Sequence, residues 1–181
     1  VGTGVLLVLA LALQAGVKMY TLKSPDGKVK LEVTAGQGIA YSLFYDGRLL
    51  LKPSRIALHT DLPEADHWEN IRITGTKQRH VSETVQAPFY RVKEFGIDCN
   101  ELELRLNNGF SLLMRAYNDG MAYRFVAGRK GEMTVVEERA EFNFADDFEA
   151  YIPYSTNPKD PWNMAFQNFY TKAPLTQYNT E

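Results

Sequence analysis

Cysteine is almost absent from the 181-residue sequence, which contains only Cys99. A single cysteine excludes an intrachain disulfide, and the three histidines, His59, His67 and His80, do not stand at the spacings of a zinc site. A free cysteine is most often buried as a small apolar side chain, so Cys99 is predicted to lie in a core. Neither covalent cross-links nor a structural zinc ion is expected to hold the chain together.

The sequence also lacks an excess of one charge and any long helical pattern. It carries 20 basic and 22 acidic residues, a formal net charge of -2, and no block of basic residues. This balance excludes the basic surface of a nucleic-acid-binding protein, so no nucleic-acid partner is expected. After residue 16, no long run shows the helical spacing of apolar side chains.

The one long apolar run is VGTGVLLVLALALQAG, residues 1–16. Its length and small final residues are typical of a signal-peptide core, whereas a membrane-spanning helix needs about 20 apolar residues. These residues are predicted to be a signal-peptide-like leader, with the mature part beginning near Val17 in the periplasm or outside the cell. A transmembrane anchor and a buried strand are the alternatives, and no stable membrane span is expected once the leader is removed.

The rest of the chain alternates apolar and polar residues, which is typical of strands with one face in water. In LKSPDGKVKLEV, for example, Val29 and Leu31 alternate with charged residues. Tight hairpin turns are predicted at Asp46-Gly47, Asn108-Gly109 and Asp119-Gly120, because these dipeptides favour them.

Residues 17–181 are therefore predicted to form one all-β domain, an antiparallel β-sandwich, since a single sheet would leave an apolar face in water. The polar segment PEADHWEN, residues 63–70, is expected to be a surface loop. The last residues, YTKAPLTQYNTE, carry no turn signal or polar tail. The sandwich is accordingly expected to be incomplete at its C-terminal end and to continue beyond Glu181.

Two arginines flank the third predicted turn. A two-residue turn at Asp119-Gly120 would place Arg115 directly opposite Arg124 in a hairpin whose faces are otherwise apolar. Such a pair requires carboxylates nearby, and the next strand offers some, so a structural Arg-Glu network is predicted. Recognition of an anionic or polyhydroxylated ligand and simple surface exposure are the alternatives. The candidate carboxylates are Glu137, Glu138 and Glu141.

Two further groups of polar residues carry weaker hypotheses. Asp146, Asp147 and Glu149 form an acidic group without the ligand spacing of a calcium loop, which favours a solvated turn. Trp162 lies between two polar residues of the types that hydrogen-bond a sugar, and an aromatic ring can stack on a pyranose. The group is a candidate sugar contact, with buried packing or a domain contact as the favoured alternative. Its members are Asp160, Trp162 and Asn163.

Four segments, SPDGKVKLEV, IAYSLFYDGRLLLKPS, LLMRAYNDGMAYRF and VVEERAEFNF, resemble the amino-terminal domain of glycoside hydrolase family 97 in order and spacing. The resemblance extends from about Ser24 to Pro174, and RAYNDGMAYRF followed by EERAEF is its most specific part. We interpret the matching residues as a structural motif, to which Glu138 and Glu141 also belong. The residues that match the family motif are Arg115, Asn118, Asp119, Gly120 and Arg124.

The resemblance implies a fold and an activity. Members of this family are exported α-glucosidases and α-galactosidases with a β-super-sandwich of the galactose-mutarotase-like type, a catalytic (β/α)₈ barrel and a small carboxy-terminal β domain. The catalytic carboxyl groups lie on the barrel, which this sequence lacks, and the calcium-binding glutamate of the sandwich would lie beyond Glu181. The resemblance thus implies that this sequence contains no catalytic or metal-binding residue and that the intact enzyme binds a Ca²⁺. It also implies two partners for the sandwich, the catalytic barrel of the same enzyme and an α-linked oligosaccharide.

The function implied by the resemblance is a non-catalytic wall of an α-glycosidase active site. A free-standing carbohydrate-binding module and a periplasmic β-sandwich interaction protein are the alternatives. Micromolar binding of maltooligosaccharides that is lost on Trp162→Ala would favour the module. The sequence does not give the sugar, nor the choice between inversion and retention, which barrel residues decide.

Overall fold

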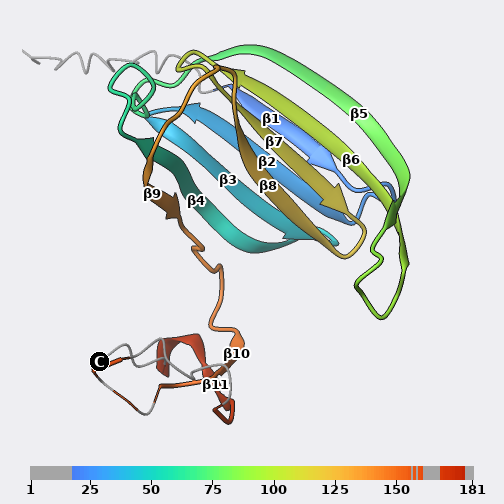
Figure 1. The fold of residues 1–181 in the computed structure, drawn as a ribbon. Coiled ribbons are helices and arrows are strands. Elements are labelled where there is room, and N and C mark those ends of the chain that lie inside the picture. Colours follow the sequence, from blue (N-terminus) through green and yellow to red (C-terminus); the bar gives the residue numbers. More distant parts are fainter. Residues whose placement is uncertain (1–17, 156, 158, 161–167, 178–181) are drawn as a thin grey trace, which may run out of the picture.

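A computed structural model describes residues 18–155, 157, 159–160 and 168–177. Over these residues antiparallel strands form two large sheets and one small one (Figure 1). The predicted all-β fold is therefore confirmed. The leader predicted at residues 1–16 lies outside the described residues, so its role stays a prediction. No helix in the described part of the chain has the length and hydropathy needed to cross a membrane.

The first sheet has five strands in the order β1-β2-β3-β4-β9. In β2, Val29, Leu31 and Val33 are buried and the residues between them are partly exposed, as the two-residue period predicts. Its strands are β1 (Met19–Lys23), β2 (Val29–Gly36), β3 (Gly38–Tyr45), β4 (Arg48–Thr60) and β9 (Val135–Ala140).

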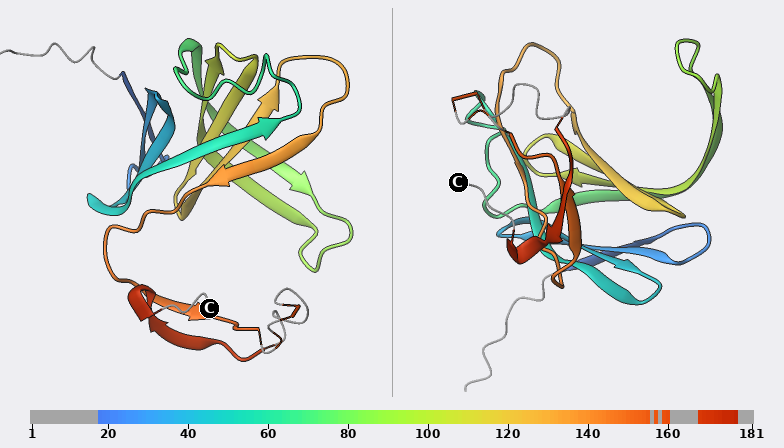
Figure 2. Two further views of the ribbon diagram at one scale, coloured as in Figure 1. Left: turned by 90° about the vertical axis from the view of Figure 1, so that its left-hand side faces the viewer. Right: turned by 90° about the horizontal axis from the view of Figure 1, so that it is seen from below.

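The second sheet has four strands in the order β5-β6-β7-β8. Beyond the ends of β7 and β8, residues 82–86 of β5 and 94–98 of β6 pair only with each other and project as a two-stranded ribbon (Figures 1 and 2). The strands are β5 (Ile73–Gln86), β6 (Glu94–Leu106), β7 (Phe110–Tyr117) and β8 (Gly120–Ala127).

The two large sheets pack face to face around one apolar core, which confirms the predicted sandwich (Figure 2). Each large apolar side chain that is removed from water contributes about 1.5–3 kcal/mol. Both inner faces supply residues that are at most 1% exposed: Leu31, Val33, Ile39, Tyr41, Ile56, Leu102, Leu104, Leu112, Met114 and Ala116.

The segment at residues 63–70 is not a simple surface loop. Trp68 is 6% exposed, its Nε1 donates a hydrogen bond of 3.0 Å to the carbonyl of Leu58, and its ring lies edge-on to that of Phe125. Ala65 is 2% exposed. The prediction was wrong at these positions because the segment closes the end of the core, a tertiary role that its polar composition conceals.

The turns differ in how well the sequence predicts them. Asp46 and Gly47 have φ values of 48° and 79°, the left-handed pair that a tight hairpin turn requires, as predicted. Between β6 and β7, Gly109 is left-handed at 84°, and the register leaves residues 107–109 as a three-residue loop. The third predicted turn, Asp119-Gly120, has no positive φ.

The small sheet lies apart from the sandwich (Figures 1 and 2). The segment that leads to it runs along β4, where the amide of Lys52 donates to the carbonyl of Asn143 at 2.8 Å. Its elements are β10 (Glu149–Ile152), β11 (Thr171–Pro174) and the 3₁₀ turn η2 (Leu175–Gln177).

Candidate functional site

The outer face of the four-stranded sheet carries a buried carboxylate between two arginines. Glu101 on β6 lies across from Arg79 on β5 and from Arg115 on β7. The Nε atoms of both arginines donate to its two oxygens at 2.7 Å. The side chain of Glu101 is 4% exposed, whereas those of Arg79 and Arg115 are 54% and 24% exposed. The group is therefore a charge network that joins three neighbouring strands.

The electrostatics of this network favour the ionised carboxylate. Burial alone would raise the pKa of Glu101, but the hydrogen bonds and charges of the two guanidinium groups outweigh it and hold that pKa below its ordinary value. The hydroxyl of Tyr117 and the carboxylate of Glu101 raise the pKa of Arg115. Glu101 is consequently ionised at neutral pH.

The predicted pairing of Arg115 with Arg124 was wrong. Arg115 faces Ala122, and Arg124 faces Leu113, so the two arginines are diagonal rather than opposite. The turn lies one residue earlier than predicted, because β8 already begins at Gly120.

The side chain of Asn118, in this earlier turn, makes a tertiary contact. Oδ1 of Asn118 accepts a hydrogen bond of 3.0 Å from the amide of Asp26, in the turn between β1 and β2. This bond ties the β7-β8 hairpin to the other sheet. Asn118 thus contacts the turn of another hairpin, whereas the structural role expected of Asp119 and Gly120 stays a prediction.

The predicted partners of the arginines were also wrong. The strand that follows β8 crosses to the other sheet, so Glu138 lies beside Leu58 and accepts a hydrogen bond of 3.1 Å from the hydroxyl of Tyr123. Glu141 binds the guanidinium of Arg139.

The same carboxylate of Glu141 accepts the amide of Arg55 at 2.9 Å, which holds the chain after β9 against β4. Glu137 forms no ion pair among the described residues, and neither does Arg124.

Glu101 was missed although the sequence contained a signal for it. In ELELRL the charged residues alternate with leucines, which places Glu101 and Glu103 on one face. A three-residue loop with Gly109 at its left-handed position brings Glu101 opposite Arg115, whereas a two-residue loop at Asn108-Gly109 does not. The loop length thus decided the partner.

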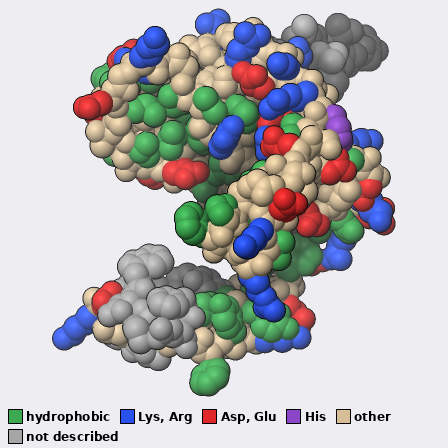
Figure 3. Space-filling view, turned by 45° about the vertical axis from the view of Figure 1, so that its right-hand side comes forward, with side chains coloured by type: hydrophobic (Ala, Val, Ile, Leu, Met, Phe, Trp, Pro, Cys, Tyr) green, Lys and Arg blue, Asp and Glu red, His purple; other side chains and the backbone are tan. Residues whose placement is uncertain are grey.

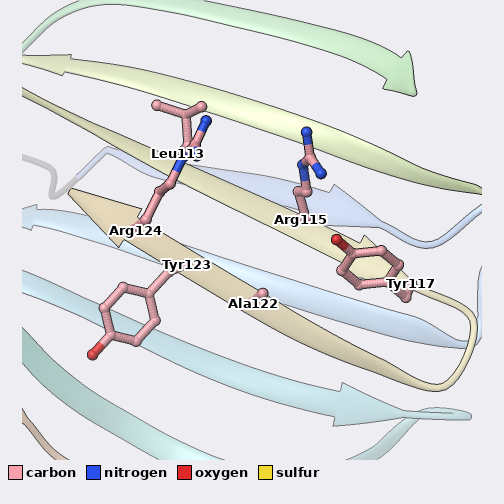
Figure 4. A pocket seen from close by; sticks show the side chains of 6 residues that line it. All are labelled: Leu113, Arg115, Tyr117, Ala122, Tyr123 and Arg124. Atoms are coloured by element: carbon pink, nitrogen blue, oxygen red, sulfur yellow. The ribbon is translucent and has the colours of Figure 1, made fainter. Parts of the chain in front are cut away.

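A pocket of about 170 Å³ lies beside the network (Figure 4). Figure 4 shows Leu113, Arg115 and Arg124 on one side of the sheet, while the ring of Tyr123 points to the opposite side. An apolar floor with two guanidinium groups suits a carboxylate or another small anion. The pocket is lined by Leu113, Arg115, Tyr117, Ala122, Tyr123 and Arg124.

The acidic group near the small sheet is tied to structural partners. Asp146 lies 3.0 Å from Arg48, Asp147 accepts the amide and hydroxyl of Thr176, and Glu149 lies 2.9 Å from Lys172. Within the described part of the chain, no three metal-ligating side chains come together.

The candidate sugar contact is described only at Asp160. Its amide donates a hydrogen bond of 3.2 Å to the carbonyl of Asn157 in a turn. Trp162 and Asn163 lie outside the described residues, so their role stays a prediction.

An apolar groove of about 270 Å³ is lined by β3, β4 and the segment that follows β9. Phe142 and Phe144 at this groove are 57% and 45% exposed, and Figure 3 shows apolar side chains on the surface of the molecule. The groove is lined by Leu43, Leu50, Leu51, Phe142, Phe144 and Phe148.

Comparison with known proteins places the chain in a family. Residues 22–181 match the family model described as "Glycosyl-hydrolase 97 N-terminal". The retaining α-galactosidase of Bacteroides thetaiotaomicron is 38% identical over 177 residues, which are 94% of this chain and 26% of that protein. A probable retaining α-galactosidase of Streptomyces bingchenggensis is 26% identical over 158 residues, 85% of this chain and 24% of that protein. The chain thus spans about a quarter of the length of these relatives.

Solved structures show the same fold. A glycoside hydrolase family 97 enzyme of Pseudoalteromonas sp. strain K8 in complex with panose gives a TM-score of 0.70 at 19% identity, over 87% of this chain and 25% of that one. A β-arabinopyranosidase gives a TM-score of 0.69 at 21% identity, over 84% of this chain and 26% of that one. The match of the family model over residues 22–181 and the long match to the Bacteroides protein show that the chain belongs to glycoside hydrolase family 97, of which it contains the amino-terminal β-sandwich.

Proposed function

We propose that the chain is the non-catalytic amino-terminal β-sandwich of an exported α-glycosidase, and that the intact enzyme is a retaining α-galactosidase. The observation that carries the proposal is the 38% identity to a retaining α-galactosidase over 94% of the chain. The fold alone does not select the sugar, because a panose-bound enzyme and a β-arabinopyranosidase share it.

The described carboxylates support a non-catalytic role. A retaining glycosidase uses two carboxyl groups about 5–5.5 Å apart, one as nucleophile and the other as acid and then base. Glu101 is buried between two arginines, and Asp146 and Asp147 are held by neighbouring side chains. We place the catalytic pair on a barrel outside the described residues, with the sandwich as a wall of the active site.

The apolar groove supports packing on such a barrel. Exposed aromatic side chains that gather at one place mark protein contact surfaces. Phe142 and Phe144 are exposed at the groove, which only leucine and phenylalanine residues line among the described residues. Covering it with the barrel would remove these rings from water at roughly 25 cal/mol per Å².

Calcium and export belong to the same proposal. The described residues do not fit a calcium site, since no three potential ligands lie together among them. We therefore place the calcium ligands that the family resemblance implies outside the described residues. The role proposed for the sandwich does not require the ion. Residues 1–16 would direct the protein to the periplasm or the medium.

The experiment is a hydrolysis assay of the product of the whole gene with 4-nitrophenyl α-galactoside and α-glucoside. We expect the galactoside to be preferred and NMR to show α-galactose as the first product. Hydrolysis of the glucoside alone, or release of the β-anomer first, would refute the assignment of the enzyme.

A matched pair of variants tests the non-catalytic role. Asp146→Asn and Asp147→Asn should leave kcat unchanged, because these carboxylates contact structural partners. A loss of turnover of several hundredfold in either variant would contradict a non-catalytic sandwich, since removal of a catalytic carboxyl has effects of that order.

A further inference from the structure

The strand β5 leaves one long edge of the second sheet open. It stands at the end of the order β5-β6-β7-β8 and forms the outer boundary of this sheet in Figure 1. From Thr76 to Gln86 it pairs with β6 without a shift of register, and no proline interrupts it. Proteins generally protect an edge of this length with prolines, bulges or a covering segment, because its unpaired backbone groups invite another strand.

One hydrogen bond identifies the backbone groups that face outward. The amide of Ala87 donates to the carbonyl of Lys93 at 2.7 Å, directly after the paired residues Gln86 and Glu94. Hydrogen-bonded positions alternate in an antiparallel ladder, so the odd-numbered residues of β5 bond to β6. The even-numbered residues from Thr76 to Gln86 therefore point their amides and carbonyls away from the sheet. Among the described residues, no hydrogen bond reaches these outward groups.

The charges of this edge are self-complementary about Val81, the midpoint of the open edge at residues 76–86. Arg79 precedes Val81 by two positions and Glu83 follows it by two, so all three side chains lie on the outer face of the sheet. Glu83 is exposed and forms no ion pair among the described residues. A two-fold axis through Val81 would place Arg79 of each copy opposite Glu83 of the other, and opposite charges that face each other stabilise a strand pair.

Other two-fold registers are less favourable. The outward groups belong to even-numbered residues, which must face each other, so the axis passes through a residue and not between two residues. An axis at Arg79 or Glu83 would set like charges opposite each other, which destabilises a strand pair. An axis at His80 would place Arg79 opposite Val81, and it would extend the pairing into the register shift at residues 73–75.

The axis at Val81 would also support the projecting ribbon. Residues 82–86 and 94–98 pair only with each other, and a two-stranded ribbon is at best marginally stable by itself. Pairing about Val81 lays residues 82–86 of each copy along residues 76–80 of the other. Each ribbon thereby gains a third strand. Val85, which is 40% exposed, would lie beside the aliphatic part of Lys77 of the second copy.

We propose that the chain binds a second copy of itself through β5, antiparallel about a two-fold axis at Val81, so that the two four-stranded sheets form one continuous sheet. A second copy is favoured over a strand of another protein because the charges of β5 complement its own reversed sequence, which only two-fold pairing requires. The proposal concerns assembly, so it does not depend on the sugar that the enzyme hydrolyses.

Cysteine cross-linking of the whole-gene product tests the position of the axis. Val81→Cys should form an intermolecular disulfide on mild oxidation, because Cα atoms that face each other at a non-hydrogen-bonded position lie about 4.5 Å apart. Val85→Cys is the matched control on the same face of β5, since the axis would hold its two copies roughly 26 Å apart. Cys99 is buried and common to both variants.

The control also separates pairing from random collision. Val85 is 40% exposed and Val81 is 7% exposed, so collision would cross-link Val85→Cys more readily. We expect a cross-linked dimer of Val81→Cys and little or none of Val85→Cys. Equal or stronger cross-linking of Val85→Cys, or none in either variant, would overturn the proposal.

Charge reversal tests the ion pairs across the axis. Sedimentation velocity of the whole-gene product should show a dimer that dissociates on dilution. Glu83→Arg would face Arg79 in both halves of the interface and should raise the Kd of the dimer by about tenfold. Glu132→Arg is the matched control, because Glu132 is exposed, forms no ion pair among the described residues and changes the net charge equally. A monomer at every concentration, or the same Kd in the two variants, would overturn the proposal.

Discussion

Replacement of Glu101 by glutamine should destabilise the sandwich strongly at neutral pH. The change keeps the size of the side chain but removes the charge that Arg79 and Arg115 share at 2.7 Å. Glutamine can accept one of the two hydrogen bonds, and its NH₂ group then faces the other guanidinium. The 24%-exposed side chain of Arg115 would be left without a counter-charge.

The size of the expected loss of stability follows from the burial of the charged groups. Two unit charges about 4 Å apart attract by roughly 4 kcal/mol at an effective dielectric constant of 20, and desolvation of the carboxylate offsets much of this. Breaking a buried ion pair by removing one partner costs about 3–5 kcal/mol. Because Arg79 is 54% exposed and can be rehydrated, we expect a loss of about 2–4 kcal/mol.

Urea unfolding followed by tryptophan fluorescence measures this loss, since the buried Trp68 reports on the core. Glu103→Gln is the matched control on the same face of β6. It should change stability by no more than about 0.5 kcal/mol, because the one hydrogen bond to its side chain among the described residues is a 3.5 Å bond from Ser111. If the unmodified protein and Glu101→Gln were equally stable at pH 7, the charge of Glu101 would not stabilise the sandwich, and the prediction would be refuted.

The pH dependence gives a second measure of the same group. A carboxylate whose pKa is lowered on folding stabilises the protein above the pKa of the unfolded chain, about 4.3 for Glu. That stabilisation is lost as the pH falls through the lower pKa of the folded state. The difference in the free energy of unfolding between the unmodified protein and Glu101→Gln should therefore shrink progressively below about pH 4.

Three further changes test other parts of the structure. Gly120→Ala should cost less than about 0.5 kcal/mol, because Gly120 has no positive φ and open space around its Cα, whereas Gly47→Ala at φ 79° should cost about 1–2 kcal/mol; the two variants would cost about the same if the hairpin turned on Asp119-Gly120. Burial and the nearby Glu138 raise the pKa of Tyr123 to about 12, so the folded protein loses stability as the pH rises from 10 to 12. In Tyr123→Phe the free energy of unfolding should fall less steeply over this range, because phenylalanine has no hydroxyl to ionise. Cys99 is 0% exposed, and burial raises the pKa of its thiol, so it should react with a thiol reagent only after urea unfolding; rapid labelling of the native protein would contradict its place in the fold.

Much of the fold could be predicted because the signals are local. Alternation in LKSPDGKVKLEV and the Asp46-Gly47 turn depend on neighbouring residues, and both appear in β2 and in the β3-β4 hairpin as expected. The burial of Trp68 could not be predicted in the same way. Its segment is polar, and only the open end of the core makes a position for the ring.

The arginine network shows why the site was harder to predict than the strands. The sequence indicated that Arg115 needs a carboxylate, which the structure supplies, but not which one. The choice of Glu101 over Glu138 depended on the length of one loop and on β9 crossing to the other sheet. Each of these is decided by contacts between residues far apart in the chain.

By itself the sequence determined that this protein is an antiparallel β-sandwich with an apolar core, because a two-residue period and turn residues act over a few positions. Only the tertiary structure decided the strand register and the partner of each charge. Moving a turn by one residue changes no apolar pattern, yet it changes which side chains face each other across two strands.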